Sequence, residues 1–498
     1  MQVANVRIST SVEACEVGAD VTFDEAQEGP FYLFYRFPRE FVSDTTESLG
    51  DAFVAALLPV AMACAEPLVL EAPLTKELAL SLDAIQNIYH EWEPLMSKIA
   101  VLPKREITGS PPIEASGIGL FFSLGVDSFY SLLANVNKPS TERITHLILV
   151  RGFDIPLNAS YDRAFETALS AAQEVANHYS MSLVAVTTNV RQLADKFIPW
   201  GRIFHGAALA SVGLAMRGAL RQCYIASTCD DSHLKPWGSH PQLDPLWGTP
   251  KTTFVHDASD VSRLKKISYI SNYRPPMEWL RVCYQNAEDC YNCGRCNKCV
   301  QTMVSLQLVH GLHRCKTLPN EINLALFDHI QTNQTVISSL FWQEIVDALG
   351  DSSVAPDLKL AVDRFLEQAR SIVTPENSWM YQDWLALKQS VAAEMEPWIP
   401  PTAIVVVAGQ ESISRWITNS IRIHSFPEQD GVFWGAPADD ATAIKYLAQA
   451  RQKGSRYFLV DRECFWWLDY YKSLREYLDR SCDTIIRNDK MILLRFSE

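Results

Sequence analysis

The chain has 498 residues, 48% of them hydrophobic and 20% charged, with a formal net charge of -14. A chain of this length and globular composition predicts about two to four domains and excludes a disordered protein. The excess of acidic residues argues against a nucleic-acid-binding protein, because non-specific affinity for a phosphate backbone comes from Lys and Arg.

Two further features concern location. The start, Met1–Arg7, lacks the basic and apolar regions of a signal peptide, and the apolar stretch Ala52–Ala65 is too short to span a bilayer. Twelve cysteines in a chain without such a signal indicate reduced thiols, and five of them lie between Cys283 and Cys299. We therefore expect a cytoplasmic protein without a membrane partner, in which this cluster binds a metal.

Residues 1–114 predict a small N-terminal α+β domain. Pro30–Phe37 has the aromatic character of a strand, and Ser48–Ala63 and Leu80–Ile99 show helical periodicity. The segment Leu102–Gly117 is rich in Pro, Gly and Ser, which is typical of a connection between domains. We expect a boundary near residue 115 and assign no chemistry to this domain.

Residues 115–318 predict the central domain. Apolar runs alternate here with helical patterns, which favours an α/β fold with a doubly wound, mostly parallel sheet and ligands at the carboxyl ends of its strands. Strands are expected over Ile118–Phe122, Thr145–Val150, Leu183–Val186 and Cys223–Ala226, and helices over Asp127–Ala134, Ala164–Tyr179 and His205–Ala219.

The remaining chain predicts a helical region over 319–400 and a small C-terminal α/β domain over 401–498. Asn320–Met395 has mainly helical patterns. Beyond Pro400 and Pro401, strands are expected over Ala403–Val407, Tyr457–Val460 and Met491–Phe496, and a helix over Asp440–Lys453.

The turn after the first central strand carries the first candidate chemistry. Ser123, Gly125, Asp127 and Ser128 lie between an apolar strand and a helix, where unsatisfied N–H groups and the helix dipole favour an anion. Asp127, in the first helical turn, is placed to hold Mg²⁺ while a nucleotide supplies other oxygens. The alternative is an ordinary capped turn, since Ser and Asp are common N-caps.

This segment resembles the Ser-Gly-Gly-x-Asp-Ser loop of the PP-loop ATP pyrophosphatases, with Leu124 in place of the first glycine. The resemblance implies an adenine nucleotide alpha hydrolase-like fold and cleavage of ATP between the α and β phosphates. It also implies that the nucleotide is bound by Ser123, Leu124, Gly125, Val126, Asp127 and Ser128.

Two basic residues join Asp127 as candidate catalytic groups. Pro199–Phe204 is similar to the Pro-Gly-Arg-Asn element of the 7-cyano-7-deazaguanine synthases, which implies that Arg202 faces the nucleotide. Ser262–Ile267 is similar to that family's Thr-Lys-x-Glu-Ile helix start, which implies a phosphate contact by Lys266. The alternative for Arg202 is a surface residue with a buried stem.

The cysteine cluster predicts a metal site. Cys-x-x-Cys steps let successive thiolates converge on one tetrahedral ion, and Zn²⁺ fits this set better than an iron–sulfur cluster, whose usual final spacing and proline are absent. Spacing alone permits either Cys283 or Cys290 as the fourth ligand. The resemblance to the deazaguanine synthases selects Cys283 with Cys293, Cys296 and Cys299, and a fully liganded zinc is structural.

The loop after the last central strand is the candidate substrate site. Asp230–Trp247 faintly resembles the Gly-Tyr-Pro-Asp-Cys-Arg loop of the same family, which implies that Asp244 accepts hydrogen bonds from a guanine-like base. His240 and Trp237 are candidates to line that pocket. A plain surface loop is the alternative, because Pro and Gly punctuate any loop.

Together the motifs predict an AMP-forming C–N ligase that uses ATP, Mg²⁺ and a structural Zn²⁺. A carboxylate, such as a 7-carboxy-7-deazaguanine-like base, is adenylated and then passed to ammonia or an amine. Enlarged relatives occur in bacterial antiphage systems, which makes a protein acceptor held by an end domain an alternative. Natural-product amide ligation and a non-catalytic nucleotide-binding module, the latter motivated by Leu124, are further alternatives.

Overall fold

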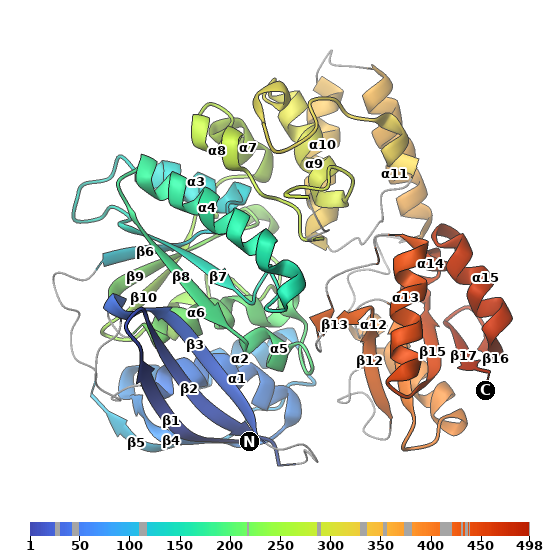
Figure 1. The fold of residues 1–498 in the computed structure, drawn as a ribbon, viewed down its shortest axis with the longest axis horizontal. Coiled ribbons are helices and arrows are strands. Elements are labelled where there is room, and N and C mark those ends of the chain that lie inside the picture. Colours follow the sequence, from blue (N-terminus) through green and yellow to red (C-terminus); the bar gives the residue numbers. More distant parts are fainter. Residues whose placement is uncertain are drawn as a thin grey trace. The chain divides into compact units, whose positions relative to one another are not determined.

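The computed structural model divides into two compact units, each with its own sheet (Figure 1). The first unit is Met1–Ile322 with Leu340–Val354, and the second is Asn323–Ser339 with Ala355–Glu498. The structure describes residues 1–24, 30–41, 49–108, 117–216, 219–285, 290–328, 336–351, 356–372, 381–408, 421–429, 432–433, 437 and 439–497.

The first unit is built on a ten-stranded sheet with the order β10-β9-β6-β7-β8-β3-β2-β1-β4-β5. Its strands are β1 (Gln2–Thr10), β2 (Ala14–Thr22), β3 (Phe31–Pro38), β4 (Leu68–Thr75), β5 (Val101–Ile107), β6 (Gly117–Phe121), β7 (His146–Arg151), β8 (Ser182–Thr188), β9 (Leu220–Ala226) and β10 (Thr253–Asp257).

The half of this sheet from β10 to β8 is entirely parallel. The helices α3 (Val126–Asn135) and α4 (Asp162–His178) lie on one side of it and α6 (His205–Ala215) on the other (Figure 1). Because parallel strands need crossover helices, which cover both faces, the inner strands β6 and β7 are mainly buried and apolar. The predicted α/β class and mostly parallel sheet are confirmed.

The N-terminal residues extend the same sheet. The meander β1-β2-β3 joins it where β3 pairs antiparallel with β8, and the Tyr35 hydroxyl of β3 donates to Ser211 Oγ of α6 at 2.9 Å. Helix α1 (Leu49–Cys64) packs against α6 and is buried on all sides, which explains why its sequence is apolar apart from Asp51. Residues 1–107 therefore share a unit with the central region, and the boundary expected near residue 115 falls at 109–116, outside the described residues.

One prediction in this region is wrong. Leu102–Ile107, expected to be part of a linker, belongs to β5, which pairs parallel with β4. Pro103 is compatible with a strand here because β5 lies at the sheet edge, where one side of the backbone needs no partner strand. The strand expected at Pro30–Phe37 is confirmed as β3, and the helix expected at Leu80–Ile99 is α2 (Lys76–Trp92).

Further helices complete the first unit. They are α5 (Val190–Ala194), α7 (Arg263–Ile270), α8 (Arg274–Trp279), α9 (Asn297–Leu308) and, from Leu340 onward, α10 (Val336–Asp351). One hydrophobic cluster joins α3, α4, α7 and α9, and it includes Leu124 of the candidate nucleotide loop together with Cys283 and Cys299. The loop and the cysteines therefore share a core.

The second unit carries a five-stranded sheet with the order β12-β11-β15-β17-β16, and a two-stranded sheet of β13 (Glu428–Gln429) and β14 (Val432–Phe433). The expected strands and helix are confirmed as β11 (Ile404–Ala408), β15 (Ser455–Asp461), β17 (Met491–Phe496) and α13 (Asp440–Gln452). The unit also contains β12 (Arg422–Phe426), β16 (Cys482–Arg487), α11 (Pro356–Ile372), α12 (Tyr381–Met395), α14 (Trp466–Tyr470) and α15 (Lys472–Ser481).

The core of the second unit contains an ion pair. Lys388 Nζ of α12 donates to Asp461 Oδ2 of β15 at 2.6 Å, and both side chains are buried. Among the described residues of the whole chain, no helix is both long enough and apolar enough to cross a bilayer.

The shared sheet predicts that the N-terminal segment is required for folding. A chain that lacks residues 1–108 exposes the β8 edge and the face of α6 that α1 covers, and such surfaces favour aggregation. We expect this truncation to be recovered mainly in the insoluble fraction after expression, while the full chain is soluble. A monodisperse, cooperatively unfolding fragment starting at residue 109 would contradict this expectation.

Candidate functional site

The candidate nucleotide loop lies at the switch point of the parallel half-sheet. The chain runs from β6 outward through β7 to β8 and then returns to place β9 on the other side of β6. The crevice between the carboxyl ends of two such strands is where open α/β sheets bind ligands. The loop Phe122–Gly125 follows β6, and Ser227 follows β9, so both lie at this crevice.

Leu124 holds the loop to the core. Its φ is 64°, in the left-handed region that glycine adopts most easily, and its side chain is fully buried in the hydrophobic cluster. Its carbonyl accepts a hydrogen bond from the Arg281 amide at 2.9 Å. Leucine therefore takes up a glycine-like backbone conformation here, and its side chain is packed in the core.

Asp127 is the central charged group of the loop. The Arg263 guanidinium of α7 donates from Nη1 to Asp127 Oδ2, and Lys266 Nζ lies 3.8 Å from Oδ1. Although Oδ1 is buried, it accepts no hydrogen bond from any residue that the structure describes. Buried polar atoms are nearly always satisfied, and a carboxylate oxygen with this capacity can accept from a further donor or bind a hard cation.

Lys266 is the second cation beside this carboxylate. Its side chain is 0% exposed, and Nζ donates to the Ser227 carbonyl at 2.6 Å. Burial lowers the pKa of Lys266 below the usual value for lysine, and the neighbouring Asp127 carboxylate opposes this shift. Two cations and one carboxylate thus meet where β6 and β9 end.

The loop also presents a helix N-terminus. Helix α3 begins at Val126 with Gly125 as its N-cap, and Ser128 Oγ donates to the Gly125 carbonyl at 3.1 Å. Ser123 is exposed at the start of the turn, whereas Ser128 is buried. Orphan amides at such an end and the positive helix dipole favour phosphate oxygens.

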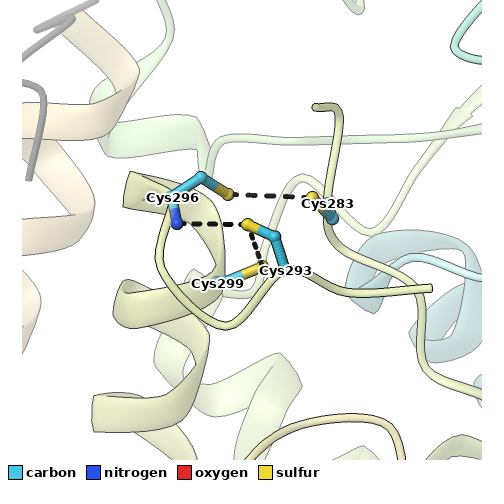
Figure 2. A group of neighbouring side chains, drawn as sticks. All are labelled: Cys283, Cys293, Cys296 and Cys299. Carbon is cyan, nitrogen blue, oxygen red and sulfur yellow. Dashed lines mark hydrogen bonds between the residues drawn. The ribbon is translucent and has the colours of Figure 1, made fainter. Parts of the chain in front are cut away.

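Four cysteine sulfurs form a compact cluster (Figure 2). Those of Cys283, Cys293, Cys296 and Cys299 all lie within 4.8 Å of one another, with 4.0 Å between Cys283 and Cys296 and 3.9 Å between Cys293 and Cys299. Sulfurs at about 2.3 Å from a tetrahedral Zn²⁺ are about 3.8 Å apart, so the set fits this ion. Cys290 is exposed and outside the cluster, which resolves the choice between it and Cys283.

The local structure explains how the four thiols converge. Asn292 Oδ1 accepts from the amides of Val282 and Cys283, at 2.8 and 3.0 Å, and so ties the first ligand to the turn that carries the others. Gly294 has a φ of 69°, which lets the turn fold back. Hydrogen bonds from the other three thiols hold the pKa of Cys283 far below its usual value.

The candidate residue Arg202 lies in a short π-helix, Trp200–Phe204, and pairs with the Glu93 carboxylate at 3.2 Å. Glu93 is the C-cap of α2, so the N-terminal segment orients this guanidinium. Trp237 packs against the same π-helix, because a Cβ at Gly201 would stand 2.8 Å from its ring. Arg202 and Trp237 are thus associated with the same π-helix.

The candidate substrate residue Asp244 is fully buried. Its Oδ2 accepts from Ser239 Oγ at 2.6 Å and lies 2.8 Å from His256 Nδ1, while Oδ1 accepts from the His240 amide at 3.3 Å. The His240 ring is 5.1 Å from that of Trp92, and burial lowers the pKa of His240. In this structure Asp244 organises its own loop, with His240 beside it.

Several residues at these sites were missed by the sequence analysis. Arg263 holds Asp127, and its place as the first residue of a basic helix start was a signal. No sequence signal marked Arg281, Glu93 or His256, because hydrogen bonds between distant segments leave no periodic pattern. His256 Nε2 and the hydroxyl of Tyr89, which lies near Asp244, are buried without a described hydrogen-bond partner.

In comparisons with known proteins, no family, no curated protein and no solved structure matches this chain.

Restoring glycine at residue 124 tests how the loop is held. Leu124→Gly relieves about 1–2 kcal/mol of left-handed strain but forfeits the packing of a buried leucine, which costs about 3–5 kcal/mol. We expect the free energy of unfolding in urea to fall by about 2–3 kcal/mol. The control is Ala65→Gly. Ala65 is exposed and has a φ of 54°, so glycine relieves the left-handed strain there and leaves no cavity. It is expected to raise stability by up to about 1 kcal/mol; equal stabilisation by both changes would contradict the packing role.

The cysteine cluster predicts one bound zinc per chain. Cys296→Ser removes one ligand, and we expect the zinc content measured by mass spectrometry of metals to fall from one equivalent to below about one tenth, with a lower melting temperature. Cys290→Ser is the matched control and should retain full zinc. Zinc lost in the Cys290 variant and kept in the Cys296 variant would contradict the ligand set.

Proposed function

We propose that this chain is an ATP pyrophosphatase of the PP-loop type that adenylates a carboxylate and transfers the acyl group to ammonia or an amine. The observation that carries the proposal is the buried Oδ1 of Asp127 at the crevice between β6 and β9, which accepts no hydrogen bond from a described residue. A carboxylate oxygen here suits Mg²⁺, which usually keeps one or two protein carboxylates and takes phosphate oxygens as further ligands.

The charges around Asp127 support a triphosphate. Arg263 and Lys266 offset the nucleotide's negative charge, and the orphan amides at the start of α3 point to the same place. With a Mg²⁺ held by Asp127, the Arg263 guanidinium would be available to a phosphate oxygen.

The strand order supports the finer fold assignment. Taken in chain order from β6, the parallel strands are arranged 3-2-1-4-5, with the loop after the first of them. This is a doubly wound order, and it agrees with an adenine nucleotide alpha hydrolase-like fold. The buried side chain of Leu124 supports an ordered loop, because it ties the turn before α3 to the hydrophobic core.

The reaction follows from these groups. A carboxylate oxygen of the substrate attacks the α-phosphorus, the bond from that phosphorus to the oxygen bridging to the β-phosphate breaks, and pyrophosphate leaves. Arg263 and Lys266 stabilise the charge on the departing oxygens. Ammonia or an amine then attacks the acyl carbon, the carbon–oxygen bond to AMP breaks, and the nitrogen loses a proton to give the amide. Bound Mg²⁺ would neutralise charge on the leaving pyrophosphate.

The substrate we propose is a 7-carboxy-7-deazaguanine-like base bound near Arg202, Trp237 and the loop of His240 and Asp244. The ring of Trp237 offers a stacking surface to a planar base. A protein amine is a second candidate acceptor, favoured by the second unit, whose separate sheet and core exceed what a small-molecule synthase needs.

The test is turnover with a defined base. Purified protein is mixed with Mg-ATP and 7-carboxy-7-deazaguanine, with and without ammonia, and AMP, amide and nitrile products are measured by mass spectrometry. We expect AMP and product from the wild type and at least about 100-fold less from Asp127→Asn, which keeps the shape of the side chain but removes its charge. The control is Asp83→Asn, an exposed change on α2.

The outcomes separate the candidate functions. AMP release with another carboxylate or a protein amine, but not with this base, would keep the adenylation chemistry and change the substrate. Tight binding of Mg-ATP with no turnover under any substrate would support a non-catalytic nucleotide-binding module instead.

A further inference from the structure

Helix α10 reaches the candidate nucleotide site from outside the region that resembles the PP-loop enzymes. That resemblance ends near residue 310, whereas α10 spans Val336–Asp351. The part from Leu340 to Val354 belongs to the first unit, although the chain on both sides of it belongs to the second. This segment, about three helical turns long, therefore packs with α7 and α9 of the first unit.

Phe341 contacts the cation that holds Asp127. The Arg263 guanidinium carbon lies 5.1 Å from the centre of the Phe341 ring, within the range of a cation–π interaction. The Arg263 side chain is only 11% exposed, so water screens this contact weakly. Its other side is bound by the Asp127 carboxylate. The aromatic face and the carboxylate together restrict the guanidinium to one orientation.

Glu344 binds the backbone next to Arg263. One helical turn after Phe341, its Oε2 accepts from the Leu264 amide in the first turn of α7 at 2.9 Å. This carboxylate satisfies an orphan donor at the helix N-terminus and complements the helix dipole. Arg263 is the first residue of α7, so the bond sets where its side chain starts.

Helix α10 is itself anchored to the cysteine cluster. Trp342 is buried and donates from Nε1 to Asn297 Oδ1 at 2.9 Å. Asn297 opens α9 between the ligand candidates Cys296 and Cys299. A continuous set of contacts therefore runs from the cysteines through Asn297 and α10 to Arg263 and Asp127.

We propose that Phe341 and Glu344 of α10 are positioning residues of the nucleotide site, which hold Arg263 so that it can pass from Asp127 to a phosphate of Mg-ATP. This inference rests on the proposed function, since it assumes that the loop binds a nucleotide. Arginine has high rotamer entropy, so a side chain that is oriented before binding loses less freedom when it meets a phosphate. Residues 115–310 alone would then lack part of the nucleotide site, because Phe341 and Glu344 lie outside them.

The experiment is a double-mutant cycle on binding of Mg-ATP, measured by titration calorimetry in the full chain. Arg263→Ala removes the guanidinium and is expected to raise the Kd by about 100-fold, as expected for a charge-assisted phosphate contact. Phe341→Leu keeps a side chain that fills the space but loses the ring, and we expect the Kd to rise by about 3- to 10-fold. Phe341→Tyr keeps the ring and should bind like the wild type.

The double variant decides whether Phe341 acts through Arg263. In the Arg263→Ala background, Phe341→Leu should change the Kd by less than about twofold, because the group it positions is gone. Glu344→Ala should follow the same rule. The control on the same helix is Asp347→Asn, which is exposed and should leave the Kd unchanged. Zinc content and melting temperature are measured for each variant to verify folding.

Each outcome has one meaning. An unchanged Kd in Phe341→Leu, or the same shift with and without Arg263, overturns the positioning role while the proposed nucleotide site stands. Absence of Mg-ATP binding by the wild type overturns the proposed function and the positioning role with it. Loss of the Phe341 effect in the Arg263→Ala background supports the inference.

Discussion

The hydrogen bond from the Arg281 amide to the Leu124 carbonyl joins the two chemical centres of the first unit. On one side, Leu124 fixes the turn that leads into α3 and Asp127. On the other, Arg281 is two residues before Cys283, whose amide is held by Asn292. Because Leu124 and Cys283 are buried in the same hydrophobic cluster, neither segment can shift without disturbing the other. A closed metal site here would stabilise the loop without touching a ligand.

The charged groups of the loop are poor candidates for a purely stabilising role. Lys266 is fully buried, and the desolvation of such a charge can exceed what an ion pair at 3.8 Å returns. Apolar residues would fill the same space at lower cost to stability. The buried Asp127 Oδ1, which accepts no hydrogen bond from a described residue, adds to that cost. A site that retains these groups is better explained by a ligand that completes their interactions.

The structure gives the N-terminal segment a role that its sequence did not indicate. It showed no catalytic motif, yet the end of α2 contacts the candidate substrate residues: Glu93 pairs with Arg202, and Trp92 packs against His240. The shared sheet explains this, since β3 beside β8 places the first hundred residues against α6 and its preceding π-helix. The N-terminal segment thus belongs to the same structural unit as the loop and contacts the candidate substrate residues.

The sequence by itself determined the alternation of strands and helices, the place of the loop before α3, and the metal-ligand spacing of the cysteines. These are local properties: apolar periodicity, turn residues and short spacings act between neighbours in the chain. Only the tertiary structure decided that Cys283 and not Cys290 joins the cluster, that residues 1–107 extend the central sheet, and that Arg263 rather than a solvent shell meets Asp127. Each of these depends on contacts between segments far apart in the chain, and hydrogen bonds and ion pairs of that kind leave no periodic trace in the sequence.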